Sequence, residues 1–194
     1  MNILSLLSKT EESRVRYASY ETKETVFLEG DECLSIGILI EGSIAIMTYS
    51  ILGNEIIFNT LGKGQIFGNN LIFSSSPFYK GDVVTRAPTK IAFIDKKDLI
   101  DILKNNDVFL LQYLELQSDL GKTLNSKIRL LSLNSARERL WYLLEENGGS
   151  YNYSSVTALA RELNLERETL SRTITALIKE RLIVKEDRTL KIRP

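Results

Sequence analysis

One segment near the C-terminus carries the side chains best suited to binding chemistry. If residues 167–179 form an α-helix, the 100° rotation per residue places Arg172, Thr175 and Lys179 within about 40° of Glu168 on one face. Arg167 and Ser171 flank that face. Arginine donates two hydrogen bonds to guanine O6 and N7, and a carboxylate accepts one from cytosine N4. The face therefore has the chemistry needed to read base edges in DNA.

The same face has a simpler interpretation. Glu168 and Arg172 are four residues apart, so they could form an ion pair on a solvated helix surface, worth about 0.2–0.5 kcal/mol. If the face does bind DNA, the carboxylate of Glu168 repels the phosphates, so it favours only a register of the helix on DNA that places it against a cytosine edge. Spacing alone leaves both interpretations open.

The composition restricts other chemistry. The 194 residues include no histidine, which removes the commonest metal and haem ligand and the commonest general base. The single cysteine, Cys33, excludes an intrachain disulfide and a four-thiolate iron–sulfur cluster. We predict that Cys33 is a small packing residue, with a redox-sensing thiol as the alternative. We expect no enzyme activity, no metal and no cofactor.

Charge and hydropathy add two expectations. The chain has 25 basic and 25 acidic side chains, so any nucleic-acid binding must come from a local patch. No apolar run approaches the roughly 18–20 residues of a membrane span, and residues 1–9 lack the features of a signal peptide. We therefore expect a cytoplasmic protein that does not bind membranes.

Three helices and a hairpin are predicted to position the polar face. Apolar spacing and capping residues indicate helices over 135–147, 156–163 and 166–180, followed by strands over 182–185 and 189–192. In the third helix the buried face would comprise Leu170, Ile174, Leu177 and Ile178. Asn164 tolerates the left-handed conformation of a tight turn. Two helices joined in this way match a helix-turn-helix with a small wing.

The N-terminal part is predicted to be β. Eight of the 11 glycines lie between Gly30 and Gly81, and strands are expected over 25–28, 34–40, 43–49, 55–61, 83–85 and 90–95. Turns at such short intervals suggest a sandwich or barrel. A short helix is expected over 96–105.

A long helix is expected to follow, from an N-cap at Asp107 to about Ser132. Its apolar series keeps the alternating 4,3 step of a coiled-coil seam, through Leu110, Leu114, Gln117, Gly121, Leu124, Ile128 and Leu131. Gly121 would permit close approach of a second helix. This pattern predicts a homodimer interface, and the alternative is a single helix buried within its own chain.

Several motifs resemble one family in sequence order. Arg167-Glu168-Thr169-Leu170-Ser171-Arg172 resembles the recognition helix of the Crp/Fnr regulators, and residues 159–164 resemble the helix before it. Residues 135–140 are similar to the segment after the hinge. Residues 27–31, 40–44 and 64–68 are similar to motifs of the family's sensor.

The resemblance implies an α+β fold in three parts. It implies a β-roll sensor, which is a cyclic-nucleotide-binding-like double-stranded β-helix, over residues 1–106, a dimerisation helix over 107–133, and a winged helix-turn-helix over 134–194. Base reading would fall to Arg167, Glu168, Ser171 and Arg172, with a preference for TGA-type half-sites in palindromic DNA. Phosphate contacts would come from Ser154, Ser155, Thr157, Thr169, Thr175, Lys179, Lys185 and Arg188.

The sensor departs from the cyclic-nucleotide branch of the family. The resemblance places a candidate effector pocket at Phe67, Gly68, Asn69, Asn70, Gly81, Asp82, Val83 and Thr85. Asn69 stands where that branch has a glutamate, and Gly81 and Asp82 stand where it has an Arg-Ser pair. A carboxylate beside a phosphate costs at least ~1 kcal/mol in water. Dependence on a cyclic nucleotide is therefore not expected, and the effector would be an unidentified small molecule or absent.

Two functional hypotheses follow. The first is a homodimeric, DNA-binding transcription regulator, with double-stranded promoter DNA and RNA polymerase as partners. The second is a signalling or scaffold module that binds a protein partner rather than DNA. They differ in salt dependence, because DNA binding weakens steeply as counterions compete for the phosphates.

Overall fold

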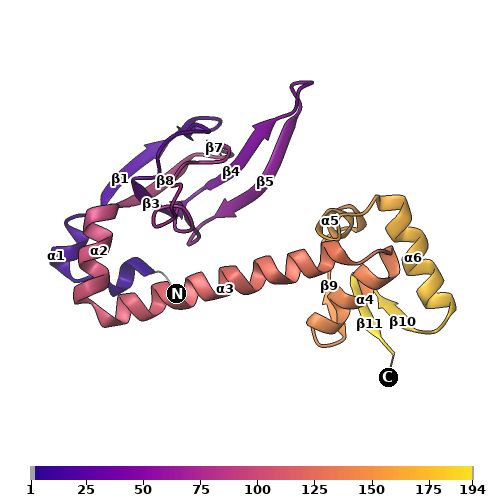
Figure 1. The fold of residues 1–194 in the computed structure, drawn as a ribbon. Helices are drawn as coiled ribbons and strands as arrows, with labels where there is room; N and C mark the ends of the chain where they lie inside the picture. The colour runs from indigo at the N-terminus through magenta and orange to yellow at the C-terminus, as the bar shows by residue number, and fades with distance from the viewer. Residues whose placement is uncertain (1–2, 194) are drawn as a thin grey trace. The chain divides into compact units, whose positions relative to one another are not determined.

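The computed structural model describes residues 3–193 and contains both sheets and helices (Figure 1). The predicted α+β class is therefore confirmed. The chain divides into two compact units between Ser118 and Asp119, within helix α3 (Asp107–Ser132). None of the helices within residues 3–193 is long and apolar enough to span a membrane.

The first unit contains two four-stranded antiparallel sheets, with strand orders β1-β8-β3-β6 and β2-β7-β4-β5. Their strands are β1 (Arg16–Tyr20), β2 (Thr25–Phe27), β3 (Ser35–Glu41), β4 (Ser43–Tyr49), β5 (Glu55–Gly62), β6 (Ile66–Phe67), β7 (Asp82–Thr85) and β8 (Thr89–Asp95). The six predicted strands are confirmed, with ends shifted by at most one residue. Strands β1 and β6 were not predicted.

A single core lies inside this unit. Ile36, Ile38, Ile44 and Ile91 are completely buried in it. Close packing requires glycine at one position of β3, because a Cβ on Gly37 would lie 2.2 Å from the ring of Phe67. The sheets therefore bury their apolar faces on each other, which is how a sandwich excludes water.

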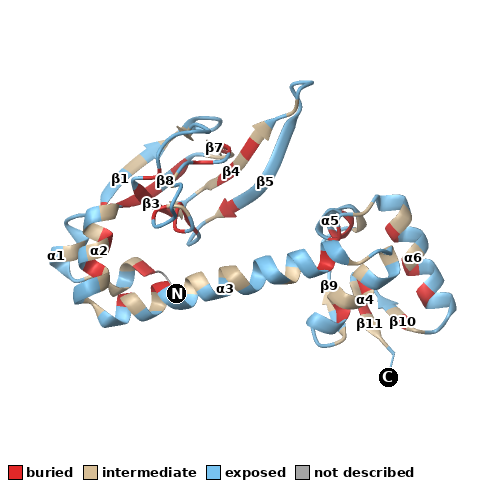
Figure 2. Ribbon diagram, in the orientation of Figure 1, coloured by how far each residue is buried: buried red, intermediate tan, exposed pale blue. Residues whose placement is uncertain are grey.

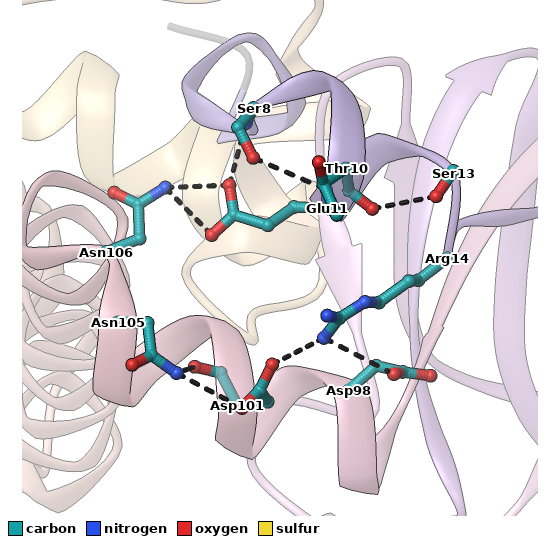
Figure 3. Close-up of polar contacts among 9 residues, drawn as sticks. All are labelled: Ser8, Thr10, Glu11, Ser13, Arg14, Asp98, Asp101, Asn105 and Asn106. Atoms are coloured by element: carbon teal, nitrogen blue, oxygen red, sulfur yellow. Dashed lines mark hydrogen bonds and ion pairs between the residues drawn. The ribbon is translucent and has the colours of Figure 1, made fainter.

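The N-terminal segment is bonded to residues 98–106 by hydrogen bonds and ion pairs (Figure 3). It contains a short 3-10 helix, Ile3–Leu6, and helix α1 (Lys9–Glu12), neither of which was predicted. Asn106 Nδ2 donates to both carboxylate oxygens of Glu11, at 3.3 and 3.2 Å. Arg14 pairs with Asp98 and Asp101 of helix α2 (Lys96–Asn105), which has the predicted bounds.

Helix α3 is capped by a different residue from the one expected. Asn106 Oδ1 accepts a hydrogen bond from the main-chain N–H of Phe109 at 3.0 Å, so Asn106 is the N-cap. The prediction that Asp107 is the cap was wrong, and Asp107 is the first helical residue. Both residue types favour this position, so the sequence could not separate them.

The second unit combines the end of α3 with three helices and a three-stranded sheet. Its elements are α4 (Ala136–Glu146), β9 (Ser150–Asn152), α5 (Val156–Glu162), α6 (Arg167–Lys179), β10 (Ile183–Glu186) and β11 (Thr189–Ile192), with sheet order β10-β11-β9. The three predicted helices and the hairpin are confirmed. Strand β9 was missed, because three polar and aromatic residues carry no clear strand signal. Buried leucines from all three helices fill the core, including Leu140, Leu159 and Leu170.

Candidate nucleic-acid interface

Helix α6 has one buried face and one exposed face (Figure 2). Leu170, Ile174 and Leu177 lie in the core of the second unit. The prediction that Ile178 is buried with them was wrong, because its side chain is 37% exposed in the last turn of the helix. The opposite face is solvent-exposed, which fixes the direction in which the polar side chains point.

The turn before α6 is built by local hydrogen bonds. Asn164 adopts φ 51, confirming the predicted left-handed turn. The N–H of Leu165 donates to Ala160 O at 2.8 Å, and that of Asn164 donates to Arg161 O at 3.1 Å. These two bonds form a Schellman motif, which ends α5 and sets the start of α6. Ser155 caps α5 as expected, accepting from Ala158 N at 3.1 Å.

The four candidate base-reading residues lie around one shallow groove. Arg167, Glu168, Ser171 and Arg172 line it together with Val156 of α5, and its volume is about 510 Å³. All four side chains of α6 at this groove are exposed. Their arrangement gives two cations, one carboxylate and one hydroxyl along a single helix face.

The ion pair of the simpler interpretation is not formed. Arg172 Nε donates to the main-chain oxygen of Glu168 at 3.4 Å. None of the ion pairs within residues 3–193 joins the Glu168 carboxylate to Arg172. Both charged groups therefore remain open to solvent.

The candidate phosphate-contacting residues lie on three parts of the second unit. They are Ser154, Ser155 and Thr157 at the start of α5, Thr169, Thr175 and Lys179 on α6, and Lys185 and Arg188 on the β10–β11 hairpin. All but Thr169 are exposed. The Thr175 hydroxyl donates to Ser171 O at 3.0 Å, which leaves its oxygen as an acceptor only.

The candidate effector pocket is filled by the chain itself. Phe67, Asn69, Val83 and Thr85 are each no more than 3% exposed. Asn69 Nδ2 donates to Gln117 Oε1 at 2.7 Å, and Gln117 Nε2 donates to Asn69 O at 2.9 Å. Among the residues that the structure describes, no buried side-chain nitrogen or oxygen lacks a hydrogen-bond partner.

The glycine and aspartate expected beside a phosphate also have intrachain contacts. A Cβ on Gly81 would lie 2.8 Å from Met47 O, so this position is closed by main chain. Asp82 Oδ1 accepts from Glu29 N at 2.8 Å. Gly68 has φ +79, and Asn70 is exposed at the surface. The loop therefore presents the carboxylate of Asp82 at this point, with the exposed Lys80 two residues before it.

Cys33 lies in the same core. It is 1% exposed, and its thiol donates to Ser35 O at 3.4 Å. Burial raises the pKa of the Cys33 thiol, which disfavours the reactive thiolate. These observations support the prediction of a packing residue. No group of three or more potential metal ligands occurs within residues 3–193.

The candidate dimer seam of α3 divides into two kinds of position. Leu114, Leu124, Ile128 and Leu131 are 51, 55, 62 and 45% exposed. Leu110 is half-buried, and Gly121 has open space where a side chain would stand. Gln117 is instead bonded to Asn69 within the first unit. Most of the seam is therefore exposed apolar surface.

Sequence reasoning missed one polar residue of the second unit, Arg139. Arg139 lies in residues 135–140, the segment similar to the one after the family's hinge, but the resemblance implied no role for it. Its side chain contacts the end of α3 and the turn before α6. The sequence around an arginine in the first turns of a helix does not indicate which main-chain oxygens in other segments its side chain will contact.

Comparison with known proteins agrees with these motifs. Residues 17–106 match the family described as the cyclic nucleotide-binding domain. The cAMP-activated global transcriptional regulator CRP of Pasteurella multocida is 26% identical over 113 residues, which is 58% of this chain. The match covers 53% of that relative, so the chain spans about half the length of the curated relative it matches.

Solved structures show the same fold. The catabolite activator protein of Thermus thermophilus has a TM-score of 0.58 at 20% identity, over 100% of this chain and 94% of that one. A transcriptional regulator of Thermotoga maritima has a TM-score of 0.60 at 25% identity, and the match covers 68% of this chain and 98% of that one. A CooA variant of Carboxydothermus hydrogenoformans has a TM-score of 0.66 at 19% identity, and the match covers 100% of this chain and 92% of that one.

Proposed function

We propose that this chain is a homodimeric, sequence-specific DNA-binding transcription regulator of the Crp/Fnr type, which its motifs resemble and which its similarity to CRP supports. Residues 1–106 would form the β-roll sensor, 107–133 the dimerisation helix and 134–194 the winged helix-turn-helix. One observation carries the proposal: Arg167, Glu168, Ser171 and Arg172 surround one exposed groove on a helix whose other face is buried. The protein would act in the cytoplasm, without enzyme activity.

Recognition would begin with α6 in a major groove. There Arg172 would donate to guanine O6 and N7, and Glu168 would accept from cytosine N4 in a TGA-type half-site. Arg167 and Ser171 would contact the adjacent bases. The hairpin residues Lys185 and Arg188 would contact phosphates, which orient the protein without reading sequence.

Dimerisation would bring two such helices to one site. The exposed leucines and isoleucine of the α3 seam would pack against the same residues of a second copy, because this pattern is typical of a coiled coil. A two-fold dimer reads a palindrome whose half-sites lie about 34–36 Å apart. RNA polymerase would be a further partner at the promoter.

The filled pocket supports a regulator that is independent of cyclic nucleotides. A nucleotide phosphate would meet the carboxylate of Asp82, and Asn69 is already bonded to Gln117. Breaking such bonds costs about 1–3 kcal/mol for each buried group left unpaired. Any small-molecule effector would therefore bind elsewhere or require rearrangement of this loop.

A substitution on α6 tests the proposal directly. Arg172→Ala should weaken binding to a duplex with inverted TGA half-sites by about 1–3 kcal/mol per half-site, and should relax the preference at that base. Arg193→Ala removes an exposed arginine of the same unit and serves as the charge-matched control. Gel-shift titrations of the three proteins give the comparison. Equal affinities for wild type and Arg172→Ala would remove Arg172 from base reading.

One observation favours the alternative, a module that binds a protein partner. Ile51 and Leu52 at the tip of the β4–β5 hairpin are 106 and 86% exposed, and Ile56, Ile57 and Phe58 of edge strand β5 are also exposed. An exposed apolar edge strand suits protein contacts. Binding of a protein through this hairpin, without binding of DNA, would support the alternative.

A further inference from the structure

Arg139 joins two separate parts of the second unit. Its Nε donates to Leu133 O at 3.1 Å and its Nη2 to Leu131 O at 3.3 Å. Its Nη1 donates to Leu163 O at 3.3 Å and to Asn164 O at 2.9 Å. One half-buried side chain from α4 thus contacts four main-chain carbonyl groups.

The four carbonyl groups belong to two segments, the end of α3 and the turn before α6. Leu131 lies in the last turn of α3, and Leu133 follows it, where helical carbonyls have no partner within the helix. Leu163 and Asn164 form the turn that sets the start of α6. The guanidinium therefore ties the end of α3 to the turn that orients the base-reading helix.

Only an arginine can make this set of bonds. Its guanidinium has five N–H donors in a fixed plane, whereas a lysine ammonium has three donors at one point. Leu131 also ends the α3 seam, with its side chain 45% exposed. The same residue therefore presents its side chain to the proposed seam and its carbonyl group to Arg139.

We propose that Arg139 is a positioning residue that fixes the angle between α3 and α6, and so sets the half-site spacing that the dimer accepts. This inference rests on the proposed function. Moving one half-site by one base pair shifts it by about 3.4 Å along the axis and rotates it by about 34°. A rigid connection tolerates such a change poorly, whereas a loose connection accommodates it.

The test measures binding of the full-length chain to a series of duplexes. Each duplex carries inverted TGA half-sites, with their separation changed one base pair at a time, and one further duplex carries a single half-site. Arg139→Gln and Arg139→Lys are compared with wild type. The control is Arg137→Gln, which removes the same charge from the same helix and breaks only an exposed ion pair with Glu180, at 2.8 Å.

Wild type and Arg137→Gln should show a sharp optimum of spacing. Arg139→Gln should lose about tenfold in affinity at that optimum, change by less than about twofold on the single half-site, and show a flatter spacing profile. Arg139→Lys should resemble Arg139→Gln, because it keeps the charge without the planar fork. A loss of folded protein would weaken all duplexes by one factor, so the shape of the profile does not depend on it.

Two results would overturn the inference, and they are distinguishable. An unchanged spacing profile, with paired and single half-sites weakened equally, would show that Arg139 serves stability alone. Absence of DNA binding by wild type would refute the proposed function, and this inference with it.

Discussion

The two candidate sites differ in what their polar groups already do within the chain. At the interface on α6, Glu168 and Arg172 are exposed, and their charged groups form no ion pair with each other. In the candidate pocket of the first unit, Asn69 is buried and bonded to Gln117, and Asp82 accepts a main-chain hydrogen bond. Both sites contain family-like motifs. The charged groups on α6 are open to solvent, whereas Asn69 and Asp82 already have partners within the chain.

This difference shows that a motif can be present in a chain whose polar groups at that site are already bonded within the chain. The α6 face is held in place by leucines on its far side, so its polar residues can meet a partner without breaking existing contacts. In the pocket, a ligand would have to displace bonds that already stabilise the loop. The glycine-rich motif therefore supports the fold of the first unit, and the polar residues beside it determine what could bind there.

The largest expected effect tests whether the pocket is part of the core. Phe67 is 2% exposed and packs against the rings of Phe27 and Phe93 at 6.3 and 6.2 Å. Phe67→Ala should lower the free energy of unfolding by about 3–5 kcal/mol, because it leaves a cavity. At the interface on α6, Arg172→Ala should change the free energy of unfolding by less than about 0.5 kcal/mol. Denaturant titrations measure both.

The control for Phe67 is Phe58, whose ring is 51% exposed in the same unit. Phe58→Ala should cost less than about 1 kcal/mol. Similar losses for the two phenylalanines would contradict a filled pocket and would break the comparison between the sites.

The next effect concerns two adjacent asparagines. Asn69→Ala removes the buried amide that donates to Gln117 Oε1 and leaves that oxygen without its donor, while Gln117 Nε2 keeps its main-chain acceptor, so the variant should cost about 1–3 kcal/mol of stability. Asn70→Ala replaces an exposed neighbour and should change the free energy of unfolding by no more than about 0.5 kcal/mol. A double-mutant cycle with Gln117→Ala isolates the pair energy. Strictly additive losses would show that the two amides do not stabilise each other.

The smallest effect is a pH dependence in the second unit. The Tyr151 hydroxyl donates to both carboxylate oxygens of Glu162, at 2.7 and 2.8 Å. Burial, followed by this bond, raises the pKa of Tyr151 to about 12. A raised folded-state pKa favours the neutral phenol, so its stabilisation is complete below the ordinary value of 10.0 and is lost as pH rises towards about 12.

The matching variant is Tyr151→Phe, which has no hydroxyl group to titrate. The stability advantage of wild type over this variant should shrink as pH rises through about 10 to 12, as measured by denaturant titration. A constant difference over that range would show that the Tyr151–Glu162 bond does not determine the shift.

Much of the fold follows from local sequence signals. Helices α2 and α6 could be predicted because apolar residues recur at helical spacing, and Asn164 could be predicted to turn because asparagine tolerates positive φ. Strand β1 could not, since Arg16–Tyr20 is largely exposed and lacks regular apolar alternation. Strand β6 has only two residues and gives no periodic signal.

The candidate sites were predictable to different degrees. The α6 face follows from one helix, so its residues could be grouped by angle alone. The Asn69–Gln117 pair joins residues 48 positions apart, and the four acceptors of Arg139 come from two other segments. Contacts of this kind depend on tertiary packing, which no local pattern records.

The most direct test of the central claim is a titration of a palindromic TGA duplex with the full-length chain at several salt concentrations. The proposed function predicts two chains per duplex, preference over a duplex with scrambled half-sites, and affinity that falls steeply as salt rises. One chain per duplex, or equal affinity for palindromic and scrambled DNA, would contradict it.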